Sequence, residues 1–554
     1  MKNLFFIFIP LALSISCSKK DKVTPTSAIS ALNCASASIA ETATAGVEYS
    51  NTIIVPYDGG NGVTYSTGIS IASTGVTGLT ATLQGDRLAT FSGKFTYLIT
   101  GKASGAGTAS FAISFGNQSC SIGVPVIKDD PLIQYGTPFA NVPDRQDATM
   151  YQVNIRAFST QSGFQGVTAR LDSIKALGVN VLYLMPIFPV GSVKSVNSPY
   201  CVKDYLAVNP EFGNLDDLRA LVDGAHNRNM TVMLDWVPNH TAWDNPWISS
   251  HKDWYLQDAA GNIVIPPGTN YNDVAQLNFN NTAMRKEMIK SMKYWVYTAN
   301  VDGFRCDYAD GVPFDFWKEA VTALRSVTTH KLLLLAEGSR GDHFTAGFDY
   351  IFGFNFYGQM RGIYGNNQAV TRLDNVNTTE YSAATNEQHV VRYLTNHDVN
   401  GSDGTPLDLF GGQKGSMAAF VVVAYMKGIP MIYNGQEVGT TFKLVFPFTG
   451  ADINWTPNPS VTAEYKRIIA FRNSSLAIRR GTLTTYNNAD ICAFTKEQGT
   501  EKVFIVSNLR NTTVNYTLPA SLANSTWTDA LTGAAVSVTT QLTLSPYSYM
   551  VLKK

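Results

Sequence analysis

Four short segments that carry carboxylate side chains follow one another along the chain. They are Asp235-Trp-Val-Pro-Asn239-His240, Gly303-Phe-Arg305-Cys-Asp307, Leu335-Ala-Glu337-Gly338 and Leu394-Thr-Asn-His397-Asp398. Three of them follow or lie within apolar runs that are typical of buried strands. In a (β/α)8 barrel the C-terminal ends of the strands meet at one face, so we expect these acidic groups to converge there. Converging carboxylates are the groups that cleave a glycosidic bond.

The arginine and the carboxylates of the second and third segments have the right types for this chemistry. Residues two apart on a strand point to the same side, so Arg305 and Asp307 are expected to face the barrel mouth while Cys306 packs outward. A guanidinium beside Asp307 would hold this carboxylate ionised and oriented, as a glycosyl nucleophile requires. Glu337 ends a run of four leucines and an alanine, and such surroundings would raise its pKa and keep it protonated as a general acid. The alternatives are a structural ion pair at Arg305 and Asp307 and a solvated, inert Glu337.

Polar residues in the first and last segments are candidates for contact with a sugar. Asp398 would stabilise an oxocarbenium ion as a second ionised carboxylate, or alternatively cap the N-terminus of a helix. His397 would hydrogen-bond a sugar hydroxyl. Asp235 and His240 belong to a further polar cluster, in which Asp235 equally suits a role as partner of Arg305.

The elements that must position these residues alternate between strands and helices over residues 147–480. Strands are expected at 150–155, at 179–184 and, as the eighth, at 428–433. Alternation of this kind predicts a parallel sheet, and the length of the block favours a (β/α)8 TIM barrel with insertions. The longest insertion, 241–281, is expected between the third strand and its helix.

Two β-rich segments flank the barrel block. Residues 31–130 contain short alternating runs separated by turn signals, which predict an Ig-like β-sandwich domain. Residues 481–554 contain only short strand-like runs and are expected to form a small antiparallel β-domain. The predicted fold class is therefore α/β: a TIM barrel with an N-terminal β-sandwich and a C-terminal antiparallel β-domain.

The N-terminus has the pattern of an export signal. Lys2 is followed by an apolar stretch over 4–13, and Ser14-Ile-Ser-Cys17 resembles a bacterial lipobox. The apolar stretch is too short to span a membrane as a helix, so we interpret 1–17 as a lipoprotein signal with Cys17 as the lipidated residue and 18–30 as a tether. This predicts a lipid anchor in the bacterial outer membrane, at the cell surface or on the periplasmic face. The alternative is an ordinary secretory signal with an incidental cysteine.

The charge balance bears on the partners of the protein, and the cysteines bear on disulfide bonds and metal sites. Lys plus Arg and Asp plus Glu each total 42, and this zero net charge gives no sign of binding to nucleic acid or anionic membranes. Cys34 and Cys120 bracket the predicted sandwich, and export permits a disulfide between them; two buried free thiols are the alternative. No cysteine spacing is typical of a metal site. The oligomeric state does not follow from the sequence.

In this order, the four segments resemble those of the α-amylase superfamily, glycoside hydrolase family 13, over residues 147–554. Further matches are Ser198-Pro-Tyr200-Cys-Val-Lys-Asp204-Tyr205, Val274-Ala-Gln-Leu-Asn278 and Gly428-Ile-Pro-Met-Ile-Tyr-Asn-Gly-Gln-Glu437. The resemblance implies a short domain B at 241–281 and a domain C at 480–554.

The resemblance also implies roles by position. Asp307 is similar to the family's nucleophile, Glu337 to its acid/base and Asp398 to its transition-state stabiliser. The implied mechanism is a retaining double displacement, for which we expect the carboxyl groups of Asp307 and Glu337 to lie about 5–5.5 Å apart.

The residues that the resemblance places around the −1 sugar are Tyr200, Asp235, His240, Arg305 and His397. Among them, Tyr200 is similar to the aromatic platform beneath the sugar. The chain departs from the family at Ser198, because many members have a histidine two residues before the platform tyrosine. One contact to the −1 sugar is therefore expected to be missing.

The implied activity is hydrolysis of α-1,4-glucosidic bonds of starch or maltodextrins. The segment ending Leu277-Asn278 is intermediate between α-amylase-like and neopullulanase-like patterns, so a neopullulanase or cyclomaltodextrinase and a transglycosylase of the same family stay open. A non-catalytic glycan-binding lipoprotein is the alternative from another class. No cofactor is required. Asn239 matches a calcium ligand of many α-amylases, but one amide is insufficient for a cation that takes about six to eight oxygens, so calcium is optional and the metal site unassigned.

Overall fold

The computed structural model describes residues 25–39, 41–128, 132–159, 163–385, 387–450 and 452–554. The predicted lipidation residue Cys17 lies outside these ranges. The chain divides into two compact units, Met1–Pro131 and Leu132–Lys554. In the part of the chain that the structure describes, no helix has the length and apolar character needed to cross a membrane.

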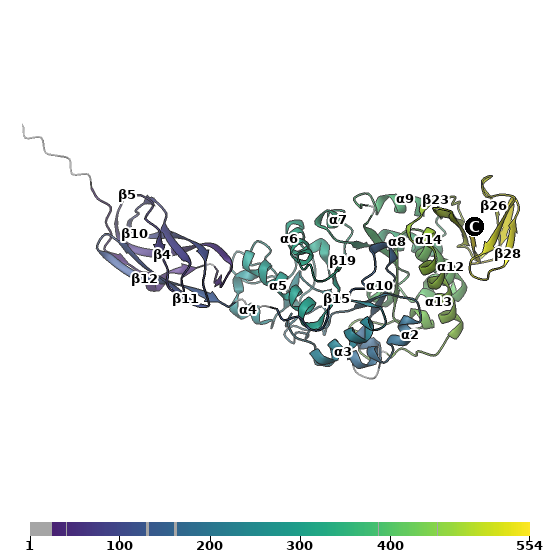
Figure 1. Cartoon of the computed structure of the whole chain (residues 1–554), viewed down its shortest axis with the longest axis horizontal. Helices are drawn as coiled ribbons and strands as arrows, with labels where there is room; N and C mark the ends of the chain where they lie inside the picture. Colours follow the sequence, from purple (N-terminus) through teal and green to yellow (C-terminus); the bar gives the residue numbers. More distant parts are fainter. Residues whose placement is uncertain (1–24, 40, 129–131, 160–162, 386, 451) are drawn as a thin grey trace, which may run out of the picture. The chain divides into compact units, whose positions relative to one another are not determined.

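Two larger β-sheets and one separate pair of short strands form the N-terminal unit (Figure 1). The first contains β1 (Ala31–Leu32), β4 (Glu48–Asn61), β10 (Thr90–Lys102), β8 (Leu79–Leu83) and β6 (Ile71–Ala72), with β2 (Ser38–Ile39) paired to β4. The second contains β3 (Ala43–Thr44), β12 (Gln118–Ile127), β11 (Gly107–Phe115) and β7 (Thr74–Gly75), and β5 (Thr64–Tyr65) pairs with β9 (Asp86–Arg87). Burial alternates along β10 of the first sheet and β11 of the second, so each sheet turns one apolar face toward a shared core.

A disulfide joins Cys34 to Cys120, with Cα atoms 6.1 Å apart. Cys34 lies in the 3-10 turn Cys34–Ser36 and Cys120 in β12, so the bond ties the start of the unit to its second sheet. The other described cysteines are buried free thiols: Cys201, Cys306 and Cys492.

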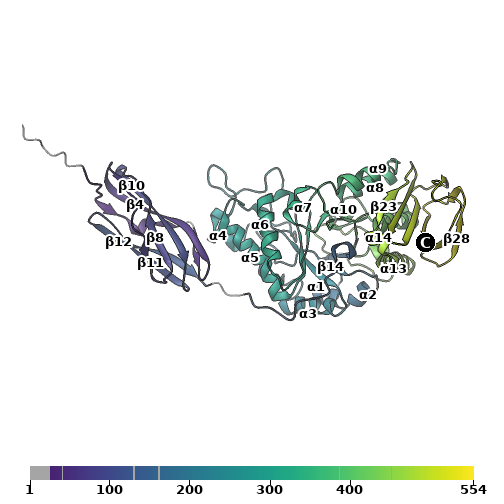
Figure 2. The same cartoon turned by 45° about the horizontal axis from the view of Figure 1, so that its top comes forward.

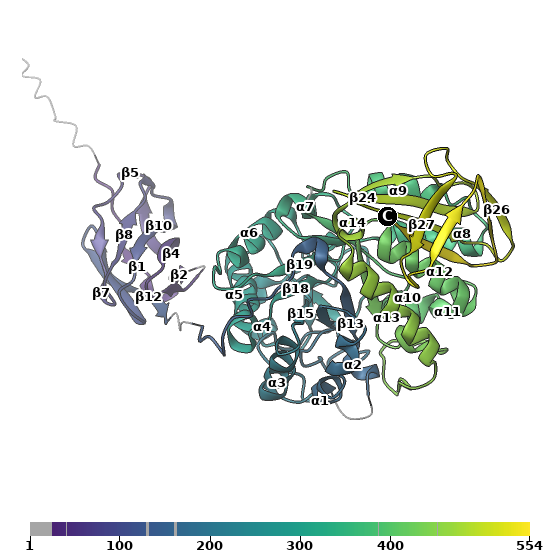
Figure 3. The same cartoon turned by 45° about the vertical axis from the view of Figure 1, so that its right-hand side comes forward.

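Eight parallel strands close a barrel in the second unit. In order they are β13 (Met150–Val153), β14 (Val181–Leu184), β15 (Thr231–Trp236), β18 (Gly303–Cys306), β19 (Leu333–Ala336), β20 (Tyr350–Phe352), β21 (His389–Arg392) and β22 (Ile429–Tyr433). Nearly every residue in these strands is buried, as expected when helices cover the outside and side chains fill the inside. Figure 3 shows β13, β15, β18 and β19 enclosed by helices. The predicted TIM barrel is confirmed.

Helices follow most of the barrel strands. They are α1 (Gly163–Thr168), α2 (Leu171–Lys175), α3 (Leu215–His226), α5 (Thr282–Ala299), α6 (Phe314–Arg325), α7 (Asp342–Ala346), α8 (Phe354–Gly365), α9 (Arg372–Thr379), α10 (His397–Ser402), α11 (Pro406–Leu409), α12 (Gly412–Tyr425), α13 (Pro459–Ser474) and α14 (Leu476–Arg480). Helix α3 shows why such segments fold locally. Asn214 and Asp217 form a reciprocal capping box at its start, and Leu218, Leu221 and Val222 form a buried stripe at helical spacing.

An excursion leaves the barrel between β15 and α5, where the sequence predicts one. In it β16 (His240–Ala242) pairs antiparallel with β17 (Val274–Gln276), and α4 (Pro246–Ser250) lies between them in the chain.

The C-terminal domain is an antiparallel sheet. Its strands are β23 (Thr482–Thr485), β24 (Ile491–Gln498), β25 (Glu501–Asn508), β30 (Tyr549–Lys553), β27 (Ser525–Asp529) and β28 (Ala535–Val538), accompanied by the pair β26 (Val514–Thr517) and β29 (Gln541–Leu544). Strands β24 and β25 contact helices α12 and α14 of the barrel. Figure 2 shows β23 of this sheet beside α14. The predicted C-terminal antiparallel domain is therefore confirmed, and it packs directly on the barrel.

Candidate active site

The register of the barrel strands brings the four segments to the same end of the barrel. Asp235 in β15 lies beside Arg305 in β18, which lies beside Leu335 in β19. The ladder continues past the strands: the Asp307 N–H donates to Trp236 O at 2.7 Å, and the Glu337 N–H donates to Cys306 O at 2.9 Å. These backbone hydrogen bonds therefore fix the positions of the main chain from which the side chains of Asp307 and Glu337 extend.

Arg305 is fully buried and joins three carboxyl groups. Its Nη1 donates to Asp235 Oδ1 at 2.7 Å and to Asp307 Oδ1 at 3.0 Å, and its Nη2 donates to Glu337 Oε1. A guanidinium is a rigid planar fork, so it holds the three groups in one arrangement. A second bond orients Glu337, because its Oε2 accepts the Tyr308 N–H at 2.8 Å. Glu337 is thus held by the protein, which contradicts the alternative of a solvated side chain.

The proton balance at Asp307 differs from the prediction. Burial raises the pKa of Asp307 well above its usual range, the Glu337 carboxylate raises it further, and Arg305 lowers it. Arg305 is therefore not the only group that acts on the charge of Asp307, because lost water and the Glu337 carboxylate act against it. Asp307 and Glu337 thus form a pair on one guanidinium. A retaining glycosidase needs such a pair to carry one proton and one charge.

Asp235 lies beneath the site and is fully buried. Its Oδ2 accepts the hydroxyl protons of Tyr183 at 2.7 Å and Tyr200 at 3.0 Å, while its Oδ1 accepts from Arg305. Because protein donors occupy both oxygens, Asp235 is placed as the partner of Arg305 and its assignment to substrate contact is corrected. Arg305 is equally enclosed and acts on a ligand only through the carboxyl groups that it holds.

Tyr200 and His397 form one wall of a cavity, with stacked rings whose centroids are 5.3 Å apart. Because a carboxylate only accepts, the Tyr200 hydroxyl proton goes to Asp235, and His397 Nε2 must donate to the Tyr200 oxygen at 2.7 Å. His397 Nδ1 then accepts from the Gln152 amide at 2.9 Å. Burial, followed by Arg305, lowers the pKa of His397 to about 4, so the ring is neutral with a defined tautomer.

Asp398 and His240 complete the polar lining of the cavity. The Asp398 side chain is 62% exposed, and the cap of α10 is Asn396, whose Oδ1 accepts from the N–H groups of Asp398 and Val399. The capping alternative for Asp398 is therefore wrong, and its carboxylate faces the cavity. Burial lowers the pKa of His240 to about 4, so this ring is also neutral.

The cavity has a volume of about 780 Å³, within the usual range for small-molecule sites. Asp307, Glu337, Asp398, Tyr200, His240 and His397 line it, and so does Ser198. Its outer walls include two segments to which the sequence analysis gave no role in the site, 270–274 and 445–448. Tyr271 and Phe446 in these segments are 47% and 48% exposed. The sequence held one signal for these two segments: each is a polar or proline-containing loop that carries an aromatic residue, Tyr271 or Phe446.

The surroundings of Asn239 do not fit a calcium ion. Its amide forms a reciprocal pair with Gln276: Asn239 Nδ2 donates to Gln276 Oε1 at 3.0 Å, and Gln276 Nε2 donates to Asn239 Oδ1 at 3.2 Å. The two amide oxygens are thus already used by neutral donors, and no carboxylate of the described residues forms a hydrogen bond with either amide. Among the described residues, no group of three or more His, Cys, Asp or Glu side chains is placed to hold a metal.

Comparison with known proteins agrees with this geometry. The family model for the α-amylase catalytic domain matches residues 135–266 and 254–456, and the model for the maltogenic amylase C-terminal domain matches 482–551. "Alpha-amylase 3" of Dictyoglomus thermophilum is 26% identical over 446 residues, covering 67% of this chain and 86% of that protein. A cyclomaltodextrinase of Geobacillus thermopakistaniensis is 27% identical over 424 residues, covering 70% and 69%.

A solved structure of an α-amylase has the same fold as this chain. The crystal structure of an α-amylase from Lactobacillus plantarum superimposes with a TM-score of 0.67 at 27% identity, covering 74% of this chain and 99% of that one. The catalytic-domain model spans more than half of the chain, and the barrel carries the converging carboxylates that such a domain requires. This chain is a glycoside hydrolase that belongs to the α-amylase family, glycoside hydrolase family 13.

Proposed function

We propose that this chain hydrolyses α-1,4-glucosidic bonds of starch or maltodextrins by a retaining double displacement. The observation that carries the proposal is the single guanidinium of Arg305, which holds Asp307 and Glu337 together at the wall of one cavity. Both carboxyl groups reach the same ligand, and the pair is suited to hold one proton between them.

In the first step Glu337 donates its proton to the glycosidic oxygen while Asp307 attacks the anomeric carbon. The bond to the leaving sugar breaks and a covalent glycosyl-enzyme forms at Asp307. In the second step Glu337 takes a proton from water, and the resulting hydroxide displaces Asp307. Asp398 stabilises the positive charge that develops on the ring, and Tyr200 supports the sugar from below. The carboxyl groups of Asp307 and Glu337 are expected about 5–5.5 Å apart during this sequence.

A cyclomaltodextrinase or neopullulanase is the second candidate. It is favoured by the C-terminal match to a maltogenic amylase and by relatives named "Cyclomaltodextrinase" and "Neopullulanase 2", each 27% identical. The same three carboxyl groups serve both reactions and also transglycosylation, so the choice depends on the outer walls of the cavity.

A product profile separates these activities. Purified full-length protein is incubated with soluble starch, β-cyclodextrin and pullulan, and products are followed over time by size and by reducing ends. Mixed maltooligosaccharides from starch support the α-amylase proposal; faster opening of β-cyclodextrin supports the second candidate. Longer glucans without new reducing ends would indicate a transglycosylase, and starch binding without any product would indicate a binding protein. Asp307→Asn and Glu337→Gln are the matched controls, and near-wild-type rates from either would refute the assigned roles.

We also propose that Cys17 carries a lipid anchor that holds the protein in the outer membrane. The support is the sequence alone: Lys2, the apolar stretch 4–13 and the lipobox-like segment that ends at Cys17. Labelled palmitate should enter the wild-type protein and not Cys17→Ser, which should leave the membrane fraction. Protease treatment of intact cells then distinguishes the cell surface from the periplasmic face. Labelling of Cys17→Ser would refute the anchor.

Catalysis is further proposed to need no cofactor. The paired amides of Asn239 and Gln276 support this, because no carboxylate accompanies them. Incubation with EDTA should leave both the rate of starch hydrolysis and the unfolding temperature unchanged. A fall in both that added calcium reverses would contradict the proposal.

A further inference from the structure

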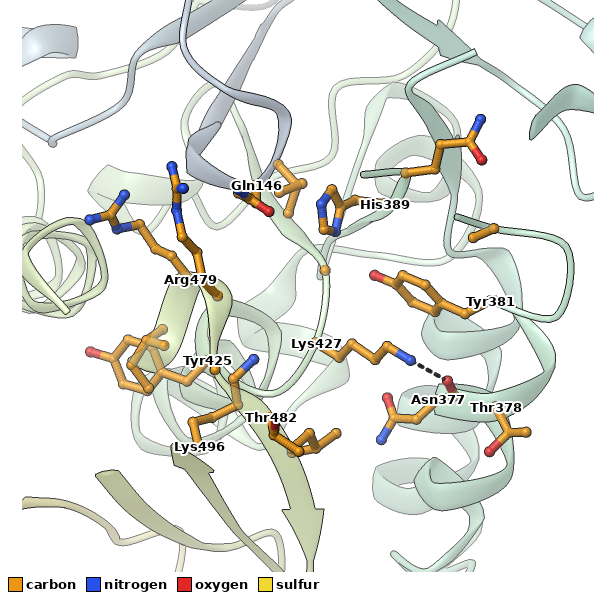
Figure 4. Close-up of a pocket in the computed structure, with 18 of the residues that line it drawn as sticks. Gln146, Asn377, Thr378, Tyr381, His389, Tyr425, Lys427, Arg479, Thr482 and Lys496 are labelled. Atoms are coloured by element: carbon orange, nitrogen blue, oxygen red, sulfur yellow. Dashed lines mark hydrogen bonds between the residues drawn. The ribbon is translucent and has the colours of Figure 1, made fainter. Parts of the chain in front are cut away.

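A second cavity, of about 540 Å³, lies at the opposite ends of the barrel strands from the active site. Its wall includes His389, the first residue of β21, and Gly428 and Ile429 at the start of β22. The other walls come from α9 and α14 and from β23 and β24 of the C-terminal domain (Figure 4). No residue lines both this cavity and the active-site cavity.

Two lysines from different domains line the same cavity (Figure 4): Lys496, and Lys427, whose amino group points toward Asn377. Lys496, on β24 of the C-terminal domain, is only 5% exposed, and its Nζ has one long contact, 3.5 Å to Met426 O. Lys427, between α12 and β22, donates to Asn377 O at 3.0 Å and lies 3.9 Å from the centre of the Tyr381 ring. An ammonium group has three donors. Within the described residues, neither lysine forms an ion pair with a carboxylate, so each retains unused donors.

The remaining charges that line the cavity do not neutralise these two, and Glu380, which acts on Lys427 from outside the lining, is paired with Arg392. Arg479 and Arg480 line it as well, but both are paired with Asp147. Asp374 is the one carboxylate among the described lining residues, and it accepts a hydrogen bond from Asn487 at 2.8 Å. The cavity therefore has an excess of positive charge.

Burial and the surrounding positive charges lower the pKa values of two groups in the cavity wall, Lys496 and His389. Burial lowers the pKa of Lys496 to about 7, and Arg472, Lys427 and Arg392 lower it further as neighbouring cations. Burial also lowers the pKa of His389 to about 4, and neighbouring cations such as Arg472 and Lys496 contribute to the same shift. Among the described residues, His389 Nε2 has no hydrogen-bond partner. Lys496 therefore gives up its proton readily, because burying an ammonium group without a counter-ion is strongly unfavourable. An anion in the cavity would remove this penalty.

We propose that this cavity, whose wall carries Lys427 and Lys496, binds a phosphate group, either free or carried on a small sugar. A phosphate group carries about 1.5–2 negative charges at neutral pH, which matches two ammonium groups better than a single carboxylate does. Its oxygens accept several hydrogen bonds, and lysine is a common phosphate ligand. The volume lies in the range of small-molecule sites, so a sugar attached to the phosphate also fits. Because one lysine belongs to the barrel and the other to the C-terminal domain, the ligand would bridge the two.

Calorimetric titration of the full-length protein tests the proposal. Inorganic phosphate and glucose 6-phosphate are titrated separately into wild type, Lys496→Met and Lys427→Met at constant ionic strength, with glucose and chloride as blanks. Both phosphates should bind wild type, and each variant should bind at least about tenfold more weakly, since one charge-assisted hydrogen bond is lost. Lys318→Met, at an exposed lysine of α6, should bind as wild type does.

The two sources of the phosphate group separate in the same experiment. Equal affinity for both probes indicates recognition of the phosphate group alone, and tighter binding of glucose 6-phosphate indicates a sugar phosphate. Without phosphate, Lys496→Met should unfold at the same or a higher temperature than wild type, because an unpaired buried charge has gone. Absence of binding to wild type, or unchanged affinity in both lysine variants, would overturn the proposal. Starch hydrolysis should be unchanged in Lys496→Met, so the outcome is independent of the proposed function.

Discussion

Replacing Arg305 with lysine tests whether the guanidinium fork organises the active site. The variant keeps a positive charge in the same place but provides a single nitrogen. In the wild type Nη1 reaches Asp235 and Asp307 while Nη2 reaches Glu337. One ammonium on a flexible stem cannot keep both sides of this arrangement.

The size of the effect follows from the contacts that are lost. Hydrogen bonds to charged groups contribute about 1.5–3 kcal/mol each. If lysine loses two of the three contacts, the barrier rises by about 3–6 kcal/mol, which corresponds to a fall in kcat/KM of roughly a hundredfold to ten-thousandfold. The assay is hydrolysis of a maltooligosaccharide with a chromogenic leaving group, with the unfolding temperature measured on the same samples.

Arg392→Lys is the matched control. Arg392 is also fully buried in a barrel strand and paired with a carboxylate, Glu380 at 3.1 Å, but it does not line the active-site cavity. We expect it to lower stability with little change in kcat/KM. The reasoning is refuted if Arg305→Lys stays within about tenfold of wild type, or if Arg392→Lys loses as much activity.

Three further predictions follow from other contacts. Tyr200→Phe keeps the ring but leaves the His397 N–H without its acceptor, so kcat/KM should fall about 5- to 150-fold; an unchanged value would contradict the hydrogen-bond chain. Burial raises the pKa of Glu437 from 4.5 to about 7, so the folded state holds this proton more tightly than the unfolded state. Stability should therefore fall, by on the order of 3 kcal/mol, as pH rises from 4.5 toward 7, and Glu437→Gln should flatten that part of the unfolding-temperature profile; parallel profiles would refute the assignment. Replacing both Cys34 and Cys120 by serine opens a cross-link between residues 86 apart and should lower the stability of the N-terminal unit by about 2–4 kcal/mol in denaturant titrations, with starch hydrolysis unchanged; equal stability would show that the disulfide constrains little.

Local patterns in the sequence were sufficient to predict the barrel and its carboxylates. Apolar runs before Asp235 and Glu337 identified strands β15 and β19, and the two-residue period placed Arg305 and Asp307 on one side of β18. Strand β20 was not found, because Tyr350–Phe352 has only three residues and is too short to show a period. Its neighbours in the barrel hold it in place, and they are distant in the chain.

The sequence by itself determined what depends on near neighbours: strand and helix periodicity, and the order of the acidic segments. Only the tertiary structure decided what depends on contacts between distant segments. It placed Asp235 beneath the site as the partner of Arg305, and it set the pKa of Asp307 through burial and Glu337. It also brought Lys427 and Lys496 to one cavity from two domains. Desolvation and charge–charge energies depend on the three-dimensional surroundings of a group, and a one-dimensional pattern does not contain them.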